Sequence, residues 1–464
     1  MISIHRGIVT IALLLVGCTA PSGREAASRP SVSAAAPASG SDVVLASHAA
    51  QENPAPAVAP LPVPQSNAAP EDDAFAGQAE LSLEVLVAKV QARNPSLQAA
   101  SEAWRAATER YPQVVSLDDP MFAAMVSPTG LGMDEAGGWN VQASQKLPWH
   151  GKRALRGSAA AAEADAMLGD VGEARLRLAE AARLALADYY LAARQSEVNA
   201  STQKLMAQFR EIALTKYQVG QAPQQDVLQA DVELAQLAVR QTELSRDRQI
   251  AAARINTLLH EPADCPLPPP PKELPAAAPP APVEVLQESA LCTRPDLYGL
   301  LARIRAEEAN LALACREYYP DVNLVARYDA MMDVDMRPQV GMDINVPLHN
   351  ARRAAAVREA ASRVAQRRAE YQDRVDQVRY EVQTAFSRAT QAAEVVRIYR
   401  EKTLPAAERS LESAQAGYTA GNLDFLRLLE AQRQLNEQRE RYYMAVAEQH
   451  RRAAELDRAV GRGQ

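Results

Sequence analysis

The sequence predicts a mainly helical protein with membrane-spanning strands, and three observations lead to this fold class. Residues 139–144 alternate apolar and polar side chains, which is typical of a strand with one apolar face. Residues 151–222 contain no proline and are rich in Ala, Glu and Arg, which predicts a very long helix. The same strand-to-helix pattern returns at residues 338–357, so the chain is predicted to contain two repeats.

Three blocks of sequence carry the repeat prediction. They recur at offsets of 200, 199 and 201 residues, and the aligned pairs are Pro95 with Pro295, Pro148 with Pro347, and Gly220 with Gly421. Nearly constant offsets in separate blocks indicate a duplicated unit. We therefore assign repeat 1 to residues 80–264 and repeat 2 to residues 284–463, joined by a proline-rich linker at 265–283.

Each repeat is expected to run helix, strand, loop, strand, long helix, glycine turn and returning helix. The predicted strands lie near residues 114–126, 139–147, 321–331 and 338–346, a length that crosses a bilayer when tilted. A loop begins at Ser127.

The long helices are expected to pack as coiled coils. Residues 151–217 would form a helix of 67 residues, about 100 Å long, with Gly169 and Gly172 softening it. Apolar residues spaced by seven, such as Leu237 and Leu244, continue along the returning helix. Pro405 should interrupt the ascending helix of repeat 2.

The N-terminus resembles a targeting signal. An apolar run at residues 8–16, too short for a comfortable membrane span, leads into Gly17-Cys18 and resembles a bacterial lipobox. This predicts a lipoprotein signal peptide at 1–17 and lipidation of Cys18; an ordinary signal peptide is the alternative. No aspartate follows the cysteine, which by resemblance to lipoprotein sorting rules favours the outer membrane. The Ala-, Pro- and Ser-rich residues 18–79 are expected to form a disordered tether.

Composition excludes several functions. With 50 basic and 57 acidic residues the net charge is −7, which gives no sign of nucleic-acid binding. No His-Glu-x-x-His, phosphate-binding Gly-x-x-x-x-Gly-Lys or Gly-x-Ser-x-Gly motif is present, so the chain is not expected to be an enzyme. The lipid on Cys18 is the one covalent group we expect, without a further cofactor.

No metal site is predicted. His150 and His349 occupy matching places after the strand-ending prolines, and polar residues at a membrane boundary explain them better than metal ligands do. Methionines 331, 332 and 336 offer thioethers suited to soft ions, but loop filling is the simpler interpretation. Pairing of Cys265 with Cys292 is left open.

Four strands cannot close a membrane barrel, since the smallest single-chain barrels have about eight. Unpaired strand edges are too costly in lipid, so spanning strands require other subunits. Two copies would supply eight strands and three would supply twelve, enough for a lumen. A small soluble sheet is the alternative, but aromatic residues at the strand ends favour a membrane: Tyr111, Trp149, Tyr318 and Tyr319.

The junction motif completes a resemblance to a known family. Leu-Pro-Trp-x-Gly-Lys-Arg at 147–153, a long helix, and Tyr-x-x-Gly at the helical tips, twice behind a lipobox, resemble the TolC family of outer-membrane efflux proteins over residues 80–460. The motif is most similar to the lipoprotein branch that serves heavy-metal resistance-nodulation-division pumps. In repeat 2 the Gly-Lys is absent, although Arg352 aligns with Arg153.

This resemblance implies an assembly and its partners. It implies a homotrimer with a twelve-stranded barrel in the outer membrane, on an α-helical tunnel through the periplasm. A periplasmic adaptor protein would meet the tips, and an inner-membrane pump would deliver the substrate. The chain would be both lipid-anchored and membrane-spanning, with a large periplasmic part.

The candidate site residues lie at the tips and at the junction. The tips are tight glycine turns that would dock the adaptor: Val219, Gly220, Gln221, Gly421, Asn422 and Leu423. Asp226 and Asp424 are gate candidates that would form acidic rings, and the alternative is that each favours its helix N-terminus. The bend between barrel and tunnel is assigned to Pro148, Trp149, Gly151 and Pro347.

The predicted function is a passive exit channel in a tripartite efflux system. Metal ions or small toxic compounds would pass through it, with the energy supplied by the pump. An exit duct for type I protein secretion uses the same fold and is the first alternative. The second is a coiled-coil envelope lipoprotein without a pore.

Overall fold

The computed structural model describes residues 75, 79–126, 138–274, 280–330 and 338–463, which lie in the second of two units, Pro70–Gln464. The predicted signal peptide, the lipidated Cys18 and nearly all of the 18–79 tether lie outside the described residues. The predicted loop at Ser127 and the methionines 331, 332 and 336 also lie outside them.

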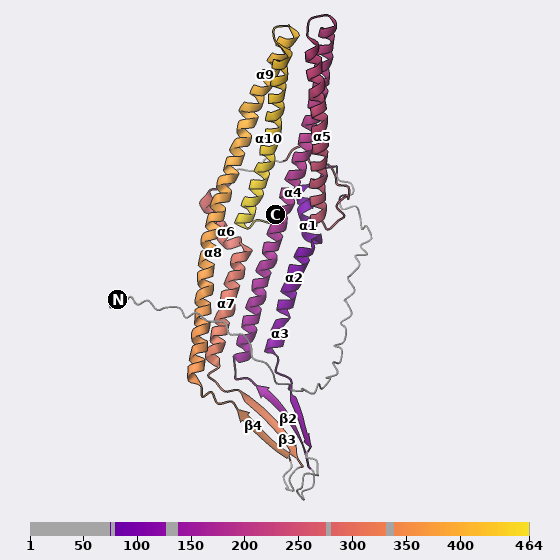
Figure 1. The fold of residues 1–464 in the computed structure, drawn as a ribbon. Coiled ribbons are helices and arrows are strands. Elements are labelled where there is room, and N and C mark those ends of the chain that lie inside the picture. Colours follow the sequence, from indigo (N-terminus) through magenta and orange to yellow (C-terminus); the bar gives the residue numbers. More distant parts are fainter. Residues whose placement is uncertain (1–74, 76–78, 127–137, 275–279, 331–337, 464) are drawn as a thin grey trace, which may run out of the picture. The chain divides into compact units, whose positions relative to one another are not determined.

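The described part is mainly helical, as predicted, and each half runs from shorter helices through two strands to a long ascending helical segment and a returning helix (Figure 1). The first half contains α1 (Leu83–Arg93), α2 (Pro95–Thr108), α3 (Arg110–Val115), β1 (Met121–Val126), β2 (Trp139–Leu147), α4 (Lys152–Gln218) and α5 (Gln224–Leu258). The second contains α6 (Val283–Thr293), α7 (Pro295–Arg316), β3 (Val322–Asp329), β4 (Pro338–Ile344), α8 (Asn350–Ile398), the π-helical turn η1 (Tyr399–Thr403), α9 (Leu404–Thr419) and α10 (Phe425–Val460).

Corresponding side chains in the two halves make corresponding contacts. Asn94, just before α2, donates its amide N–H to the carbonyl of Leu258 at 2.9 Å. Arg294, just before α7, donates to the carbonyl of Ala459 at 3.1 Å. The first contact joins the start of α2 to the end of α5, and the second joins the start of α7 to the end of α10. Such equivalence is what a duplicated unit would produce.

The first predicted strand, 114–126, begins too early. Residues 110–115 form the helix α3 instead, and β1 starts only at Met121. Pro112 is the third residue of α3, where a helix needs no N–H donor, so proline does not prevent the helix there. β2 has the predicted bounds, and β3 and β4 are slightly shorter than predicted.

The predicted long helix is confirmed as α4, which has 67 residues. Gly169 and Gly172, which were expected to soften it, have a packing role in the structure. A Cβ on Gly169 would lie 2.7 Å from the carbonyl oxygen of Pro295 and 2.9 Å from the Cα of Gly299. These glycines therefore allow α7 to approach α4 closely, and α4 continues without a break.

Pro405 does mark an interruption of the ascending helix. The five residues of η1 precede it, and Pro405 then occupies the first turn of α9. A single π-helical turn accommodates the hydrogen bond that proline cannot make, so the chain remains helical through the break.

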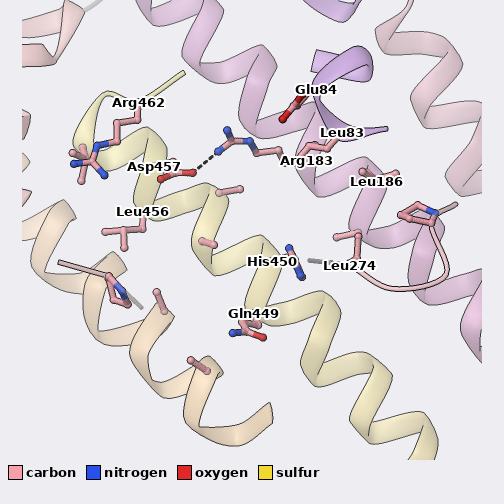
Figure 2. A pocket seen from close by; sticks show the side chains of 18 of the residues that line it. Leu83, Glu84, Arg183, Leu186, Leu274, Gln449, His450, Leu456, Asp457 and Arg462 are labelled. Carbon is pink, nitrogen blue, oxygen red and sulfur yellow. Dashed lines mark hydrogen bonds and ion pairs between the residues drawn. The ribbon is translucent and has the colours of Figure 1, made fainter. Parts of the chain in front are cut away.

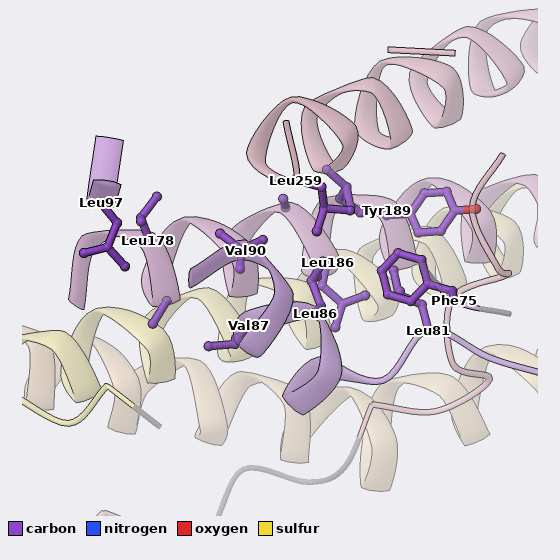
Figure 3. Close-up of a cluster of buried hydrophobic side chains, with 14 of the residues drawn as sticks. Phe75, Leu81, Leu86, Val87, Val90, Leu97, Leu178, Leu186, Tyr189 and Leu259 are labelled. Carbon is purple, nitrogen blue, oxygen red and sulfur yellow. The ribbon is translucent and has the colours of Figure 1, made fainter. Parts of the chain in front are cut away.

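Four buried clusters hold the described helices together. The largest packs α1 and the end of α5 on the middle of α4, as Figure 3 shows for Leu86, Val90, Leu186 and Leu259. The second largest joins the ends of both long hairpins and includes Phe209, Leu237, Leu411, Leu428 and Leu435. Buried positions on α5 follow the predicted seven-residue spacing: Ala230, Leu237, Leu244 and Ala251.

The strands form one antiparallel sheet in the order β1-β2-β3-β4. β2 and β3 are the inner strands, and β1 and β4 are its edges. Among the described helices, none is long and apolar enough to cross a membrane.

Candidate functional site

One face of the sheet is almost entirely apolar, as the strand register shows. We call it the apolar face; it consists of Phe122, Ala124, Val126, Trp139, Val141, Ala143, Gln145, Leu147, Val322, Leu324, Ala326, Tyr328, Pro338, Val340, Met342 and Ile344. Gln145 is its one amide, and it donates to the backbone carbonyl of Asp118 at 2.7 Å. The largest exposed fractions are 76 % for Phe122 and 89 % for Val340. An apolar surface of this extent marks an interaction with a partner or a membrane.

The opposite face is largely polar. Arg327 and Asp329 form an ion pair there, and Asn323 on β3 donates to Asp343 on β4 at 3.3 Å. Gln142 and Lys146 lie on the same face of β2. A sheet with one apolar and one polar face separates two environments, which a strand in a water-filled membrane barrel must do.

The edge strands β1 and β4 are exposed along their whole length. Within the described residues, each pairs with a strand on one side and with none on the other. Open edges invite pairing with further strands, and in lipid they must be paired.

The first strand-to-helix junction is built as the sequence indicated. Gly151 precedes α4 with φ +89°, a left-handed conformation that favours glycine. The backbone N–H of Trp149 donates to Asp321 at 2.9 Å, and the Trp149 ring stacks on Tyr319 at 5.6 Å. Pro148 is half-buried beside them.

The second junction lacks the left-handed glycine. Pro347 is half-buried between β4 and α8, and His349 precedes α8 as its N-terminal flanking residue. Both His150 and His349 are exposed. The bend residues therefore lie where they were predicted, while their effect on a barrel stays a prediction.

Lys152 is a junction residue whose role sequence reasoning missed. Its side chain is 1 % exposed and lies within 2.9 Å of Asp321 and 3.3 Å of Glu317. It also donates to the backbone carbonyl of Tyr319 at 3.0 Å. This ammonium group joins the first junction to the segment that leads into β3. The Gly-Lys-Arg motif at 151–153 marks this position in the sequence, but the motif alone indicates family resemblance and not the ion pair with Asp321.

The alignment of Arg153 with Arg352 is wrong. Arg153 donates from its guanidinium to the carbonyl of Val115 at the end of α3, with Nε at 2.7 Å. Arg353 makes the matching contact, from Nε to the carbonyl of Glu317 at 2.8 Å, whereas Arg352 is exposed. The offset between halves changes by one residue across the junction, so counting from the proline gives the wrong arginine.

Replacing Lys152 with methionine should lower the stability of the fold. The substitution keeps most of the side-chain volume but leaves the partly buried Asp321 without its ammonium partner. Breaking a buried ion pair in this way costs about 3–5 kcal/mol. Thermal unfolding followed by helical circular dichroism measures the loss, with Lys204→Met on the exposed surface of α4 as the control. Equal melting of the two variants would contradict the role assigned to Lys152.

The two helical tips are tight turns that require glycine. Gly220 has φ +74° and Gly421 has φ +77°, and both conformations favour residues without a Cβ. The docking candidates at these turns are exposed, with one exception: Val219, Gly220, Gln221, Gly421 and Asn422 face solvent, whereas Leu423 is half-buried against Gly417.

The two gate candidates differ in their surroundings. Asp424 accepts a hydrogen bond from the backbone N–H of Arg427 at 3.0 Å, so it caps α10. Asp226 lies in the first turn of α5, and its carboxylate is 3.5 Å from the hydroxyl of Tyr418 on α9. Asp424 therefore fits the helix-capping alternative, and Asp226 participates in a contact between the two hairpins.

That contact includes residues that the gate prediction did not name. Lys216 on α4 donates to the carbonyl of Tyr418, and its ammonium lies 4.2 Å from the centre of the Tyr418 ring. Phe425 packs edge-on against the same ring at 5.5 Å. We call Lys216, Asp226, Tyr418 and Phe425 the tip contact. Burial raises the pKa of Tyr418 to about 12, with Asp226 adding to the shift.

A repeated motif could have led to the tip contact. Tyr-x-x-Gly occurs at both tips, but the two tyrosines are used differently: Tyr418 is 4 % exposed and Tyr217 is 42 % exposed. The sequence pattern marks both positions and does not tell which tyrosine is buried.

Acidification should strengthen the tip contact. Burial raises the pKa of Asp226, and the nearby Asp424 adds to this, although the Tyr418 hydroxyl and Lys216 lower it. A carboxyl group with a raised pKa in the folded state contributes stability below its ordinary pKa of 3.8, and this contribution is lost as pH rises through the raised value. Hydrogen exchange of the tip amides should therefore slow as the pH falls towards 4, after correction for intrinsic rates. Asp226→Asn should remove this pH dependence of hydrogen exchange. An unchanged pH dependence in the variant would contradict the role assigned to Asp226.

No group of residues in the described ranges is arranged to hold a metal ion. Cys292 is exposed and has no disulfide bond in the described part, so the pairing with Cys265 that the sequence left open is not formed there.

Comparisons with known proteins identify a related family and related folds. A sequence model of the outer membrane efflux protein family matches residues 286–462. The outer-membrane channel OprN is 20 % identical and superposes with a TM-score of 0.68, covering 84 % of this chain and 96 % of its own. VceC, an outer membrane protein from Vibrio cholerae, is 19 % identical with a TM-score of 0.69, covering 82 % and 96 %.

CusC, whose crystal structures concern transmembrane channel formation, has the same fold. It is 17 % identical with a TM-score of 0.69, covering 82 % of this chain and 92 % of its own. No curated protein matches the chain. Outer membrane efflux proteins are non-enzymatic conduits, which confirms the prediction that the chain is not an enzyme. Residues 286–462 therefore match the outer membrane efflux protein family, and the described part has the fold of these TolC-like channels.

Proposed function

We propose that the protein is the outer-membrane exit channel of a tripartite efflux system. The observation that carries the proposal is the four-stranded sheet with one apolar face and two open edges. Such a sheet is stable in a bilayer only when further copies pair with both edges. Three copies supply twelve strands, which leave room for a lumen lined by the polar face.

An exposed seam on α5 supports assembly of several copies. Leu228, Val232, Ala235 and Val239 follow the 4-3-4 spacing of a coiled-coil seam, and all four are exposed. The buried heptad of the same helix, which includes Leu237 and Leu244, lies on another face. A second apolar seam on one helix is suited to a helix of a neighbouring copy.

The helical hairpins then form the periplasmic tunnel, and their tips meet the adaptor. The exposed tip residues provide its docking surface, and the tip contact holds the two hairpins together in a narrow state. Passage is passive, since the pump supplies the energy. Lipidation of Cys18 and the tether at 18–79 would anchor each copy in the outer membrane beside the strands. Metal ions or small toxic compounds are the proposed substrates.

Reconstitution into planar bilayers tests this function. Purified acylated protein should migrate as a trimer and produce discrete ion conductance. A monomer without conductance at every protein concentration would contradict the proposal. Deletion of the gene distinguishes the two candidate functions. Loss of metal or drug tolerance favours efflux, and loss of a secreted protein with normal tolerance favours type I secretion.

A further inference from the structure

A cavity of about 700 Å³ lies among α1, α4, α6, α8 and α10 and residues of the segment between α5 and α6, away from the sheet, the junction and the tips. Its volume falls within the range of about 300–1,000 Å³ that is usual for small-molecule sites. Figure 2 shows side chains from well-separated parts of the chain around it, among them Leu83, Leu186, Leu274 and Leu456.

The charges that line the cavity balance one another. Arg183 and Asp457 form an ion pair across α4 and α10, as the dashed line in Figure 2 shows. The remaining two charged groups, Glu84 and Arg462, are exposed and opposite in sign. A ligand with a net charge would gain no counter-charge in the interior and would lose its hydration, so the lining favours an uncharged molecule.

Two polar side chains that line the cavity have unused hydrogen-bonding capacity. His450 and Gln449 are half-buried, and neither side chain hydrogen-bonds to another residue in the described part of the chain. They follow one another on α10, and His450 lies near Leu274 in Figure 2. Burial lowers the pKa of His450, so its ring is neutral at physiological pH and can both donate and accept.

We propose that this cavity binds a small uncharged amphipathic molecule. Its apolar body would lie against the leucines, and its single polar group would bond to His450. The molecule would contact helices from both halves of the chain. A bound molecule would oppose their relative movement, and this consequence, unlike binding itself, rests on the proposed channel function.

Photolabelling tests the binding directly. The probe is a ten-carbon alcohol that carries an aliphatic diazirine, applied to the purified full-length protein, and labelled peptides are identified by mass spectrometry. Wild-type protein should be labelled on α10 near residues 449–457. It should also be labelled on the apolar face of the sheet, which serves as an internal control for probe activity.

Two variants make the result specific. Ala453→Phe fills the cavity and should reduce α10 labelling at least ten-fold, whereas Ala361→Phe on an exposed part of α8 should leave it unchanged. His450→Leu removes one hydrogen bond and should weaken labelling about 2- to 10-fold. In each variant, labelling of the sheet should persist.

Probes of different charge test the ligand class. The corresponding carboxylic acid and primary amine should label α10 less than the alcohol at equal concentration. Stronger labelling by either charged probe, no labelling of α10 in wild-type protein, or undiminished labelling in Ala453→Phe would each overturn the proposal. These outcomes are independent of conductance, so failure of this site and failure of the channel function are distinguishable.

Discussion

Met342→Arg is expected to abolish assembly of the protein in the outer membrane. Met342 lies on the apolar face of the edge strand β4, is 63 % exposed and pairs with Leu324. Arginine on the lipid face of a membrane strand costs about 2–4 kcal/mol near the bilayer centre, and each copy would carry this cost. The yield of trimer in isolated outer membranes measures the effect.

Gln339→Arg is the matched control on the same strand. Gln339 lies on the polar face, opposite Arg327 of β3, and it is exposed. An arginine there would face the water-filled lumen, and Asp329, the ion-pair partner of Arg327, would offset the repulsion between the two guanidinium groups, so assembly should remain near the wild-type yield. If Met342→Arg assembled as well as Gln339→Arg, the apolar face would not be in contact with lipid.

The double variant Lys216→Met, Tyr418→Phe is expected to increase the conductance of the reconstituted channel. It removes the ammonium that bonds to the Tyr418 carbonyl and covers its ring, and it removes the hydroxyl beside Asp226. A net hydrogen bond contributes about 0.5–1.5 kcal/mol and an exposed cation–π contact about 0.5–1 kcal/mol. A loss of about 1–2 kcal/mol per copy would shift the balance from narrow to open roughly 5- to 30-fold.

Lys204→Met controls for the loss of a positive charge on the same helix. Lys204 is exposed on α4 and lies outside the tip contact. Its replacement should leave single-channel conductance and open time unchanged. Equal conductance in the double variant and in wild-type protein would show that the tip contact does not restrict the opening.

Sequence reasoning located the elements whose signals are local. Helix α4 follows from a long run without proline, and β2 follows from the alternation of apolar and polar residues from Trp139 to Ser144. The interruption of the ascending helix near Pro405 follows from the backbone N–H that proline lacks. By contrast, the last two residues of α3, 114 and 115, were assigned to the first strand, because a few apolar residues in a row are compatible with either structure.

The errors and omissions concern contacts between distant segments. Gly169 looked like a weak point of a helix until α7 was found against it. Lys152 looked like an ordinary charged residue after a turn, and its burial depends on Asp321, 169 residues away in sequence. Tyr418 and Tyr217 share a motif, but only the tertiary packing decides which one is buried.

The central claim is that the sheet edges of three copies pair into a closed ring. Cysteines at Ala123 on β1 and Gly341 on β4, in a background with serine at Cys265, Cys292 and Cys315, test it directly. Both positions lie on the polar face, and a Cβ at Gly341 meets no neighbouring atom within 4 Å. A short bis-maleimide applied to isolated outer membranes should give a ladder of covalently linked chains that ends at three. Absence of links between chains, or a ladder that continues beyond three, would contradict it.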